Sequence, residues 1–212
     1  MLVKRGVHAC VEFRSGKTLI VVDPGAFGLP ADLPNADAIL VTHDHFDHVD
    51  HAAVAAALAQ NPAILVAGPQ ALADSAQYPV RVLSAGDTLT IGSGIDELSV
   101  EVVGRWQDIT SRLDPPIQNL GYIIGGRVLH GGDALIEHGE LDAVFVPLAA
   151  PWAKNIDVQD YLRDYPVSQV LGFHDWTLSE EGLEFAMKTL QENAEAFGAR
   201  ARALRPGESA EL

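Results

Sequence analysis

A stretch rich in histidine and aspartate directly follows an apolar run in the first quarter of the chain. Residues 38–41, Ala-Ile-Leu-Val, are uniformly apolar and are typical of a buried strand. Residues 42–48 then read Thr-His-Asp-His-Phe-Asp-His. Because side chains alternate along an extended chain, His43 and His45 should face the same side. Two imidazoles at a strand end, with an acid and a third imidazole just beyond, suit zinc or a similar divalent metal better than they suit a solvated polar loop.

Two further groups of this kind occur later in the chain, each at the predicted end of a strand. Gly131-Gly132-Asp133 follows the predicted strand 127–130, and His174-Asp175 follows residues 168–173. Taken singly, Asp133 also fits a turn acid and His174 also fits a histidine at the start of a helix. Strand ends hold side chains rigidly, so the three motifs together predict one convergent site.

The pattern His-x-His-x-Asp-His after a hydrophobic strand resembles the signature of the metallo-β-lactamase-fold hydrolases. The resemblance extends over nearly the whole chain, because the later motifs occur in the order of that family. It implies an α+β fold, an αββα sandwich of two mixed β-sheets with helices on the outer faces, formed by one domain of residues 1–212. Composition and periodicity alone support only a mixed class of helices and strands.

The same resemblance implies the metal ligands. A first metal would be held by His43 and His45, a second by Asp47, His48 and His174, and Asp133 would bridge the two. Two metal ions roughly 3.5–4 Å apart need a shared anionic ligand, and a carboxylate is suitable. We expect one or two Zn²⁺ ions per chain, with Mn²⁺ and Fe as alternatives. Asp47 is the candidate catalytic residue, because it could also orient the attacking water.

One ligand of the family pattern is missing. The family usually supplies a third histidine to the first metal, but this chain has no histidine between His51 and His130. Trp106, Gln107 and Asp108 occupy the expected neighbourhood. The sequence leaves three alternatives: an oxygen ligand from Gln107 or Asp108, a histidine that approaches in space (His8, His51 or His130), or a first site that is only partly built.

The expected activity is hydrolysis of a small ester, lactone, amide or phosphodiester by hydroxide generated at the metal. The compact size and the motif Asn119-Leu-Gly-Tyr most resemble the branch of the family that includes ascorbate-phosphate lactonase. The alternative is a catalytically silent metal- or ligand-binding protein on the same scaffold, which the absent histidine favours.

The elements that must position these residues follow from periodicity and turn signals. Strands are predicted at residues 7–13, 18–22, 38–42, 64–66, 80–83, 88–91, 98–103, 120–124, 127–130, 143–147 and 168–173. Helices are predicted after Asp50, at 69–76, at 156–164, and from a capping box at Thr177–Glu180 to Phe197. The segment 104–118 is predicted to be irregular and part of a lid, and the tail from Arg202 is predicted to fray.

Two residues near the N-terminus have open roles. His8 falls on the first predicted strand, where it reads as a packed or edge histidine more readily than as a ligand. Asp23 ends the second strand in Asp-Pro-Gly and reads either as a turn acid or, by the resemblance, as a carboxylate that supports the metal ligands from behind.

Composition limits the partners of the chain. Its 212 residues carry 29 acidic and 14 basic side chains, a net charge of −15, so we expect no binding to nucleic acid or to anionic membranes. A small-molecule substrate fits better. No apolar run approaches the roughly 18 residues of a membrane-spanning helix, and Cys10 is the only cysteine, so we expect a cytoplasmic protein. The pattern indicates no particular oligomeric state.

Overall fold

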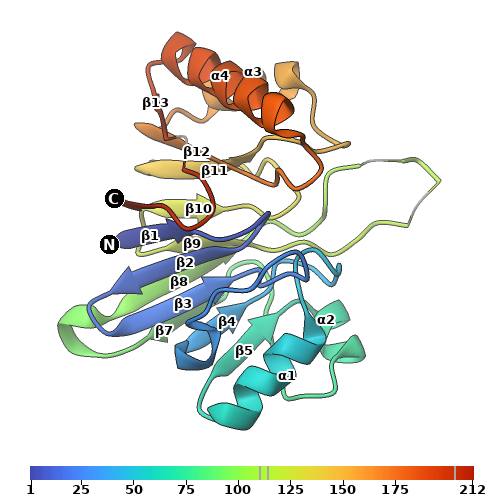
Figure 1. The fold of residues 1–212 in the computed structure, drawn as a ribbon, viewed down its shortest axis with the longest axis vertical. Coiled ribbons are helices and arrows are strands. Elements are labelled where there is room, and N and C mark those ends of the chain that lie inside the picture. Colours follow the sequence, from blue (N-terminus) through green and yellow to red (C-terminus); the bar gives the residue numbers. More distant parts are fainter. Residues whose placement is uncertain (110, 114, 203) are drawn as a thin grey trace.

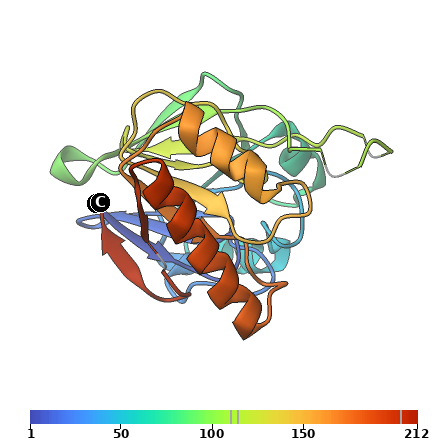
Figure 2. The same cartoon turned by 90° about the horizontal axis from the view of Figure 1, so that it is seen from above.

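Two seven-stranded β-sheets packed face to face form the body of the protein, with helices on both outer faces (Figure 1). The structure is a computed structural model, and it describes residues 1–109, 111–113, 115–202 and 204–212. Helices α1 (His51–Gln60) and α2 (Gln70–Ser75) accompany the first sheet, and α3 (Asn155–Asp164) and α4 (Glu180–Ala196) lie side by side over the second (Figures 1 and 2). The predicted αββα sandwich is therefore confirmed.

Each sheet has a parallel part beside an antiparallel part. In order across the first sheet, the strands are β14 (Ser209–Glu211), β1 (Leu2–Arg5), β2 (Val11–Ser15), β3 (Thr18–Val22), β4 (Ala38–Leu40), β5 (Leu65–Gly68) and β6 (Arg81–Val82). The second contains β13 (Arg200–Arg202), β12 (Gln169–Phe173), β11 (Ala143–Pro147), β10 (Val128–His130), β9 (Gly121–Ile124), β8 (Leu98–Val103) and β7 (Thr88–Ile91). Short 3₁₀ helices lie at Leu33–Asn35 and Gly94–Asp96.

Strand β3 shows why the central strands read as unbroken apolar runs. Its alternate residues Ile20 and Val22 belong to the core between the sheets, whereas Leu19 and Val21 belong to the core under α1. A strand that is buried on both faces has no solvent side to carry polar residues. The two sheets are also tied by a hydrogen bond of 2.6 Å from the Tyr122 hydroxyl to the carbonyl of Val41. Its effect is to fix the strand-end loop after β4 against the second sheet.

Several sequence predictions need correction. The described part of the tail is not frayed: β13, which ends at Arg202, pairs with β12, and β14 pairs with β1. The sequence pattern predicted neither β1 nor β14. The short strand β6 is parallel to β5 in the first sheet, so the antiparallel meander comprises β7 to β10. The predicted capping box at Thr177 is wrong, because Ser179 caps α4 and its hydroxyl accepts a hydrogen bond from the Gly182 amide.

The predicted first strand, residues 7–13, begins too early. Strand β2 starts at Val11, and His8 lies in a tight turn with a positive φ of 57°. That turn is closed by hydrogen bonds from the Gly6 amide to Cys10 O and from the Cys10 amide to Val7 O. His8 is therefore presented by a loop rather than by a strand. Within the described part of the chain, no helix is long and apolar enough to cross a membrane.

Candidate metal centre

The histidine- and aspartate-rich loop after β4 is fixed by a carboxylate at the end of β3. Asp23 is fully buried, and its two oxygens accept hydrogen bonds of 2.7 Å from the Thr42 amide and the Thr42 hydroxyl. The second oxygen also lies 2.7 Å from Nδ1 of His48. Gly25 lets the chain after β3 pass against the loop, because a Cβ there would lie 1.9 Å from the Asp47 carbonyl oxygen. Asp23 thus sets the ring orientation of His48, in agreement with the supporting role that the resemblance implied.

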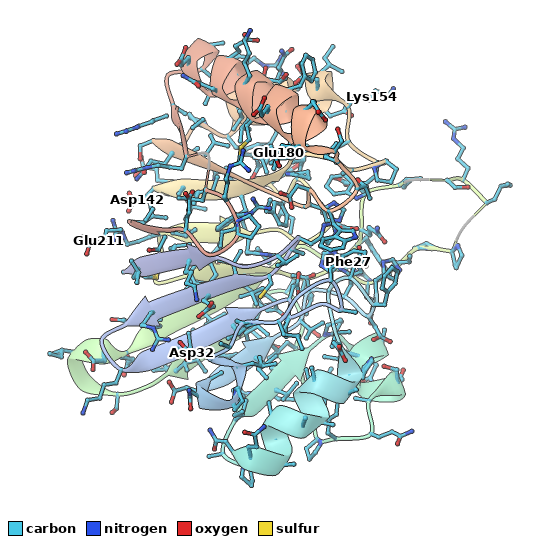
Figure 3. All side chains as sticks on the ribbon, in the orientation of Figure 1. Phe27, Asp32, Asp142, Lys154, Glu180 and Glu211 are labelled. Atoms are coloured by element: carbon cyan, nitrogen blue, oxygen red, sulfur yellow. The ribbon has the colours of Figure 1, made fainter. Side chains whose placement is uncertain are left out.

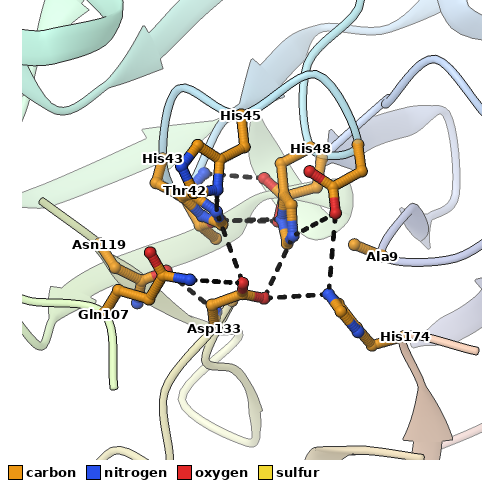
Figure 4. Close-up of polar contacts among 12 residues, drawn as sticks. Ala9, Thr42, His43, His45, His48, Gln107, Asn119, Asp133 and His174 are labelled. Atoms are coloured by element: carbon orange, nitrogen blue, oxygen red, sulfur yellow. Dashed lines mark hydrogen bonds and ion pairs between the residues drawn. The ribbon is translucent and has the colours of Figure 1, made fainter. Parts of the chain in front are cut away.

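All six predicted ligands come together at one edge of the sandwich (Figure 4). One group contains His43, His45 and Asp133, and the other contains His8, Asp47, His48 and His174; within each group the candidate ligand atoms lie within 4.8 Å of one another. Asp133 lies between the groups. Its Oδ1 is 3.2 Å from Nε2 of both His48 and His174, and its Oδ2 is 3.7 Å from Nε2 of His43.

Three buried atoms at the meeting point of the groups, Nε2 of His48, Nε2 of His174 and Oδ1 of Asp133, lie 3.2 Å apart across the two nitrogen–oxygen pairs but are not aligned for hydrogen bonds. Buried polar atoms are normally paired, so an unpaired set that converges on one point indicates a missing partner. Imidazole nitrogen and carboxylate oxygen are ordinary ligands for zinc, iron and manganese. The donor set therefore fits a divalent metal.

Electrostatics at the centre also favour a cation. Burial alone would raise the pKa of Asp47, but the hydrogen bond with His8 and the charge of His48 lower it to about 2. The pKa of Asp133 is likewise held well below its usual value, against the effect of burial, by His48 and His174. Burial would lower the pKa of His48, yet the carboxylates of Asp23 and Asp133 raise it to about 10, so a metal that binds Nε2 must displace a proton from it. Both candidate ligand carboxylates are thus ionised at neutral pH and concentrate negative charge in a buried space.

His8 is the residue that sequence reasoning placed wrongly. Its Nδ1 accepts a hydrogen bond of 3.2 Å from the Trp176 amide, and its Nε2 lies 3.2 Å from Oδ2 of Asp47. A neutral imidazole has one protonated nitrogen, so an accepting Nδ1 leaves the hydrogen on Nε2. Nε2 then donates to Asp47 and has no lone pair for a metal. His8 holds the Asp47 carboxylate in place and is not itself a ligand.

We predict that His8→Asn lowers metal affinity at the second group roughly 10–100-fold, the usual cost of losing a residue that orients a ligand. Asparagine tolerates the positive φ at this position, so the turn should persist. Metal titration followed by calorimetry would measure the effect, with circular dichroism to verify the fold. Unchanged metal affinity would show that Asp47 does not need the hydrogen bond from His8 in order to bind the metal.

Asp23 offers a separate test of how the loop is supported. The Asp23 carboxylate accepts hydrogen bonds from Thr42 and His48. In Asp23→Asn one of the two oxygens becomes an NH₂ group, which cannot accept, so one of these buried donors loses its acceptor. We predict a loss of about 1–3 kcal/mol in the free energy of unfolding of the metal-free protein, measured by urea denaturation. A variant as stable as the wild type would mean that the loop holds its shape without Asp23.

The alternatives for the missing third histidine can now be compared. His51 pairs with Asp44 and with the Tyr78 hydroxyl, and His130 lies 2.8 Å from the Ala9 carbonyl oxygen. Oδ2 of Asp108 accepts a hydrogen bond from the Leu135 amide. None of these three side chains belongs to either group of candidate ligands among the described residues. Gln107 does reach the centre, since its Nε2 donates a 2.9 Å hydrogen bond to Oδ2 of Asp133.

Asn119 also supports the centre, although the sequence singled it out only as part of a family motif. Its side-chain oxygen accepts a hydrogen bond from the Asp133 amide and its side-chain nitrogen donates to the Gly131 carbonyl. Gly132 between them has a φ of 59°, and a Cβ there would lie 2.4 Å from the Asn119 oxygen. The glycine pair therefore allows the chain after β10 to turn tightly and point Asp133 into the centre.

Two apolar surfaces flank the centre. On the side of the first group, a pocket of about 960 Å³ is lined by His45, Trp106, Gln107, Asp108, Ile109, Ser111, Arg112, Pro115, Pro116 and Ile117. On the side of the second group, Phe27 stacks on Trp176 at a centroid distance of 4.8 Å and contacts Phe46 edge-on. Phe27 lies at one edge of the sandwich (Figure 3). The segment that follows β8, residues 104–118, projects from the same edge. The described residues of the segment 104–118 (104–109, 111–113 and 115–118) are irregular as predicted, apart from an isolated bridge between Trp106 and Gln118.

The two-sheet fold, the histidine- and aspartate-rich loop and the convergent ligands are together typical of metallo-β-lactamase-fold proteins. Comparison with known proteins gives the same class. Residues 6–171 match the family described as the beta-lactamase superfamily domain, so the chain belongs to that family. Protein Rv0786c of Mycobacterium tuberculosis (strain ATCC 25618 / H37Rv) is 35% identical over 175 residues, which cover 79% of this chain and 80% of that protein. The chain is therefore a member of a superfamily of metal-dependent hydrolases.

More distant similarities agree with this assignment. Hydroxyacylglutathione hydrolase of Actinobacillus pleuropneumoniae serotype 5b (strain L20) is 29% identical over 192 residues, which cover 87% of this chain and 72% of that enzyme. The crystal structure of Igni18, a metallo hydrolase from Ignicoccus hospitalis, superposes with a TM-score of 0.72 over 100% of this chain and 98% of that chain, at 15% identity. At this low identity, the similarity to Igni18 concerns the fold alone.

Proposed function

We propose that the protein is a metal-dependent hydrolase that cleaves a small, largely apolar ester or lactone. The observation that carries the proposal is the convergence of two groups of ligand atoms on the shared carboxylate of Asp133, where three buried atoms face one another without the alignment of hydrogen bonds. His43, His45 and Asp133 would hold one divalent ion, and Asp47, His48, His174 and Asp133 the other. Zn²⁺ suits this mixture of imidazole and carboxylate, and Fe and Mn²⁺ are the alternatives.

Divalent ions, when bound, supply a nucleophile at neutral pH by acidifying water, and they polarise the bond to be cleaved. The side chains of the protein orient the water and hold the ligands in place. Asp47 accepts a hydrogen bond from His8, is partly exposed, and is ionised at neutral pH because its pKa is low. An ionised carboxylate at this place can orient water and accept its proton. Asp23 and Asn119 keep His48 and Asp133 from turning away.

The surroundings of the centre favour an apolar substrate of low charge. Half of the residues that line the pocket beside His45 are apolar, and Arg112 is the one arginine or lysine among them. On the other side, Phe46 and Trp176 remain 67% and 54% exposed and both contact Phe27, and a cluster of exposed aromatic side chains is typical of a ligand-binding surface. With a net charge of −15, the chain would also repel a phosphodiester. Among the predicted substrate classes, esters and lactones therefore fit best.

A catalytically silent metal-binding protein is the second candidate, and the observation that favours it is Gln107 in the place where the family pattern expects histidine. A weakly held first metal would leave the second position intact and the reaction slow. The resemblance to the ascorbate-phosphate lactonase branch stays a prediction, since a phosphorylated substrate would need more than Arg112 in the pocket.

A series of p-nitrophenyl esters of increasing acyl length tests the proposal. We expect turnover that is lost on chelation, restored by Zn²⁺ or Mn²⁺, and faster with longer chains. Each added CH₂ that is buried contributes about 0.8 kcal/mol, or roughly a fourfold gain in kcat/KM. Bis(p-nitrophenyl) phosphate serves as the comparison. Absence of metal-dependent turnover on all esters and on γ-lactones would favour the silent protein, and preference for the phosphodiester would overturn the substrate class.

A further inference from the structure

Gln107 is held beside the metal centre by its own backbone. Its amide donates a 2.9 Å hydrogen bond to the Ile117 carbonyl, and the next amide, that of Asp108, donates one of the same length to the Asp133 carbonyl. These two bonds join the segment after β8 both to its returning half and to the loop that carries Asp133. The side chain of Gln107 is therefore directed at the Asp133 carboxylate by a fixed piece of chain.

One end of the Gln107 side chain has no partner. Its Nε2 donates to Oδ2 of Asp133, whereas its Oε1 is buried and accepts no hydrogen bond. The oxygen and the nitrogen of an amide occupy nearly the same volume, so a half-turn about the last bond of the side chain exchanges them. After that turn the oxygen faces Oδ2 of Asp133, and a cation between the two oxygens makes this arrangement favourable.

The position of that cation coincides with the first group of ligands. Oδ2 of Asp133 is also the oxygen nearest to His43, 3.7 Å from its Nε2, and that nitrogen lies 3.0 Å from Nδ1 of His45. Two imidazole nitrogens and a carboxylate oxygen therefore surround the point that the Gln107 amide faces. Catalytic zinc sites typically use three protein ligands, and this group reaches that number only by sharing Asp133.

We propose that the amide oxygen of Gln107 replaces the absent histidine and completes the first metal position with His43, His45 and Asp133. The inference rests on the proposed metal-dependent function. An amide oxygen is neutral, whereas the second position has Asp47 besides its two histidines and also shares Asp133 with the first. The two positions therefore differ in affinity: the second fills first, and the first depends on Gln107.

Metal analysis after dialysis against a mild chelator tests this directly. We expect the wild type loaded with Zn²⁺ to bind two equivalents and to lose one of them on chelation. Gln107→Ala should bind one equivalent at the same concentration, because loss of a ligand costs at least the roughly 10–100-fold that loss of an orienting partner costs. Gln107→His should retain both equivalents through chelation. The equivalent retained by Gln107→Ala verifies that this variant is folded.

Gln118→Ala is the matched control. Gln118 belongs to the same segment, and its side-chain oxygen accepts a hydrogen bond from the Ala71 amide, away from the centre. This variant should behave like the wild type. If Gln107→Ala holds both equivalents as tightly as the wild type, or if the wild type retains two equally tight equivalents through chelation, the inference is wrong.

A crystal structure of the Zn²⁺-loaded wild type separates a ligand from a simple hydrogen-bond donor. We expect the Gln107 oxygen about 2.0–2.2 Å from the metal. A metal at His43 and His45 with the Gln107 nitrogen still bonded to Asp133 would overturn the assignment. A wild type that binds no metal would remove both this inference and the proposed function. Metal binding that depends on Gln107, without turnover of any ester, would remove only the proposed activity.

Discussion

Asp133→Asn is expected to abolish turnover and to weaken both metal positions, because among the described residues this carboxylate alone faces both groups of ligands. The change keeps the shape of the side chain but removes the charge that two adjacent metal ions share. We expect the metal affinity to fall at least about 100-fold. Loss of a residue that only orients a ligand costs up to about 100-fold, and loss of a residue that binds the metal itself should cost no less. Metal content after dialysis and ester turnover measure the two effects.

Asp142→Asn is the control for Asp133→Asn. Asp142 is an exposed acid that pairs with Arg127 at the surface, and such pairs contribute roughly 0–1 kcal/mol. This variant should retain both metal and activity. If Asp133→Asn keeps two equivalents of metal and full turnover, Asp133 does not bridge a metal pair and the arrangement of the centre must differ from the one proposed.

Asp47→Asn should lower kcat roughly 10²–10⁴-fold, the range for removal of a group that moves a proton, while the fold persists. The reason is its place in the second group, where its Oδ2 lies 3.2 Å from the His8 nitrogen that orients it. Turnover with a saturating ester and circular dichroism separate loss of chemistry from loss of structure.

Asp44→Asn is the control from the same loop. Asp44 differs from Asp47 in its partner, because it contacts His51 and does not belong to either group of ligands. Its replacement should leave turnover within about twofold, as for most surface changes of less than 0.5 kcal/mol. Equal losses in both variants would mean that the loop needs acids in general and that Asp47 has no particular role.

The convergent site could be predicted because its residues follow strands whose apolar pattern is strong. Strands β4, β10 and β12 were each predicted within a few residues, and the motifs at their ends do meet. Periodicity gives the strand ends, and a sandwich with parallel strands brings such ends to one edge. What the residues hold there remains a proposal, since the pattern alone does not distinguish a zinc site from an iron site.

His8 could not be placed correctly because its role depends on contacts distant in sequence. The alternating pattern from Val7 to Phe13 favours a strand, whereas the amide of His174 bonds to the His8 carbonyl and the amide of Trp176 bonds to its ring. Those partners lie 166 and 168 residues away in the chain, and they stabilise a turn with positive φ that local propensity disfavours.

Gln107 illustrates the opposite case, in which the sequence narrowed the choice without deciding it. Segment 104–118 has no periodicity, so the sequence named Gln107 and Asp108 together as oxygen ligands. The structure separates them, because Asp108 turns to the Leu135 amide and Gln107 turns to Asp133. The choice between neighbouring residues depends on backbone bonds that only the folded chain forms.

Anomalous diffraction from crystals of the protein loaded with Zn²⁺ tests the central claim most directly. We predict a strong anomalous peak at the zinc edge within about 2.0–2.2 Å of His48, His174, Asp47 and Asp133, and a weaker one beside His43 and His45. Zinc bound only elsewhere on the molecule, with these side chains left in contact with one another, would contradict the account.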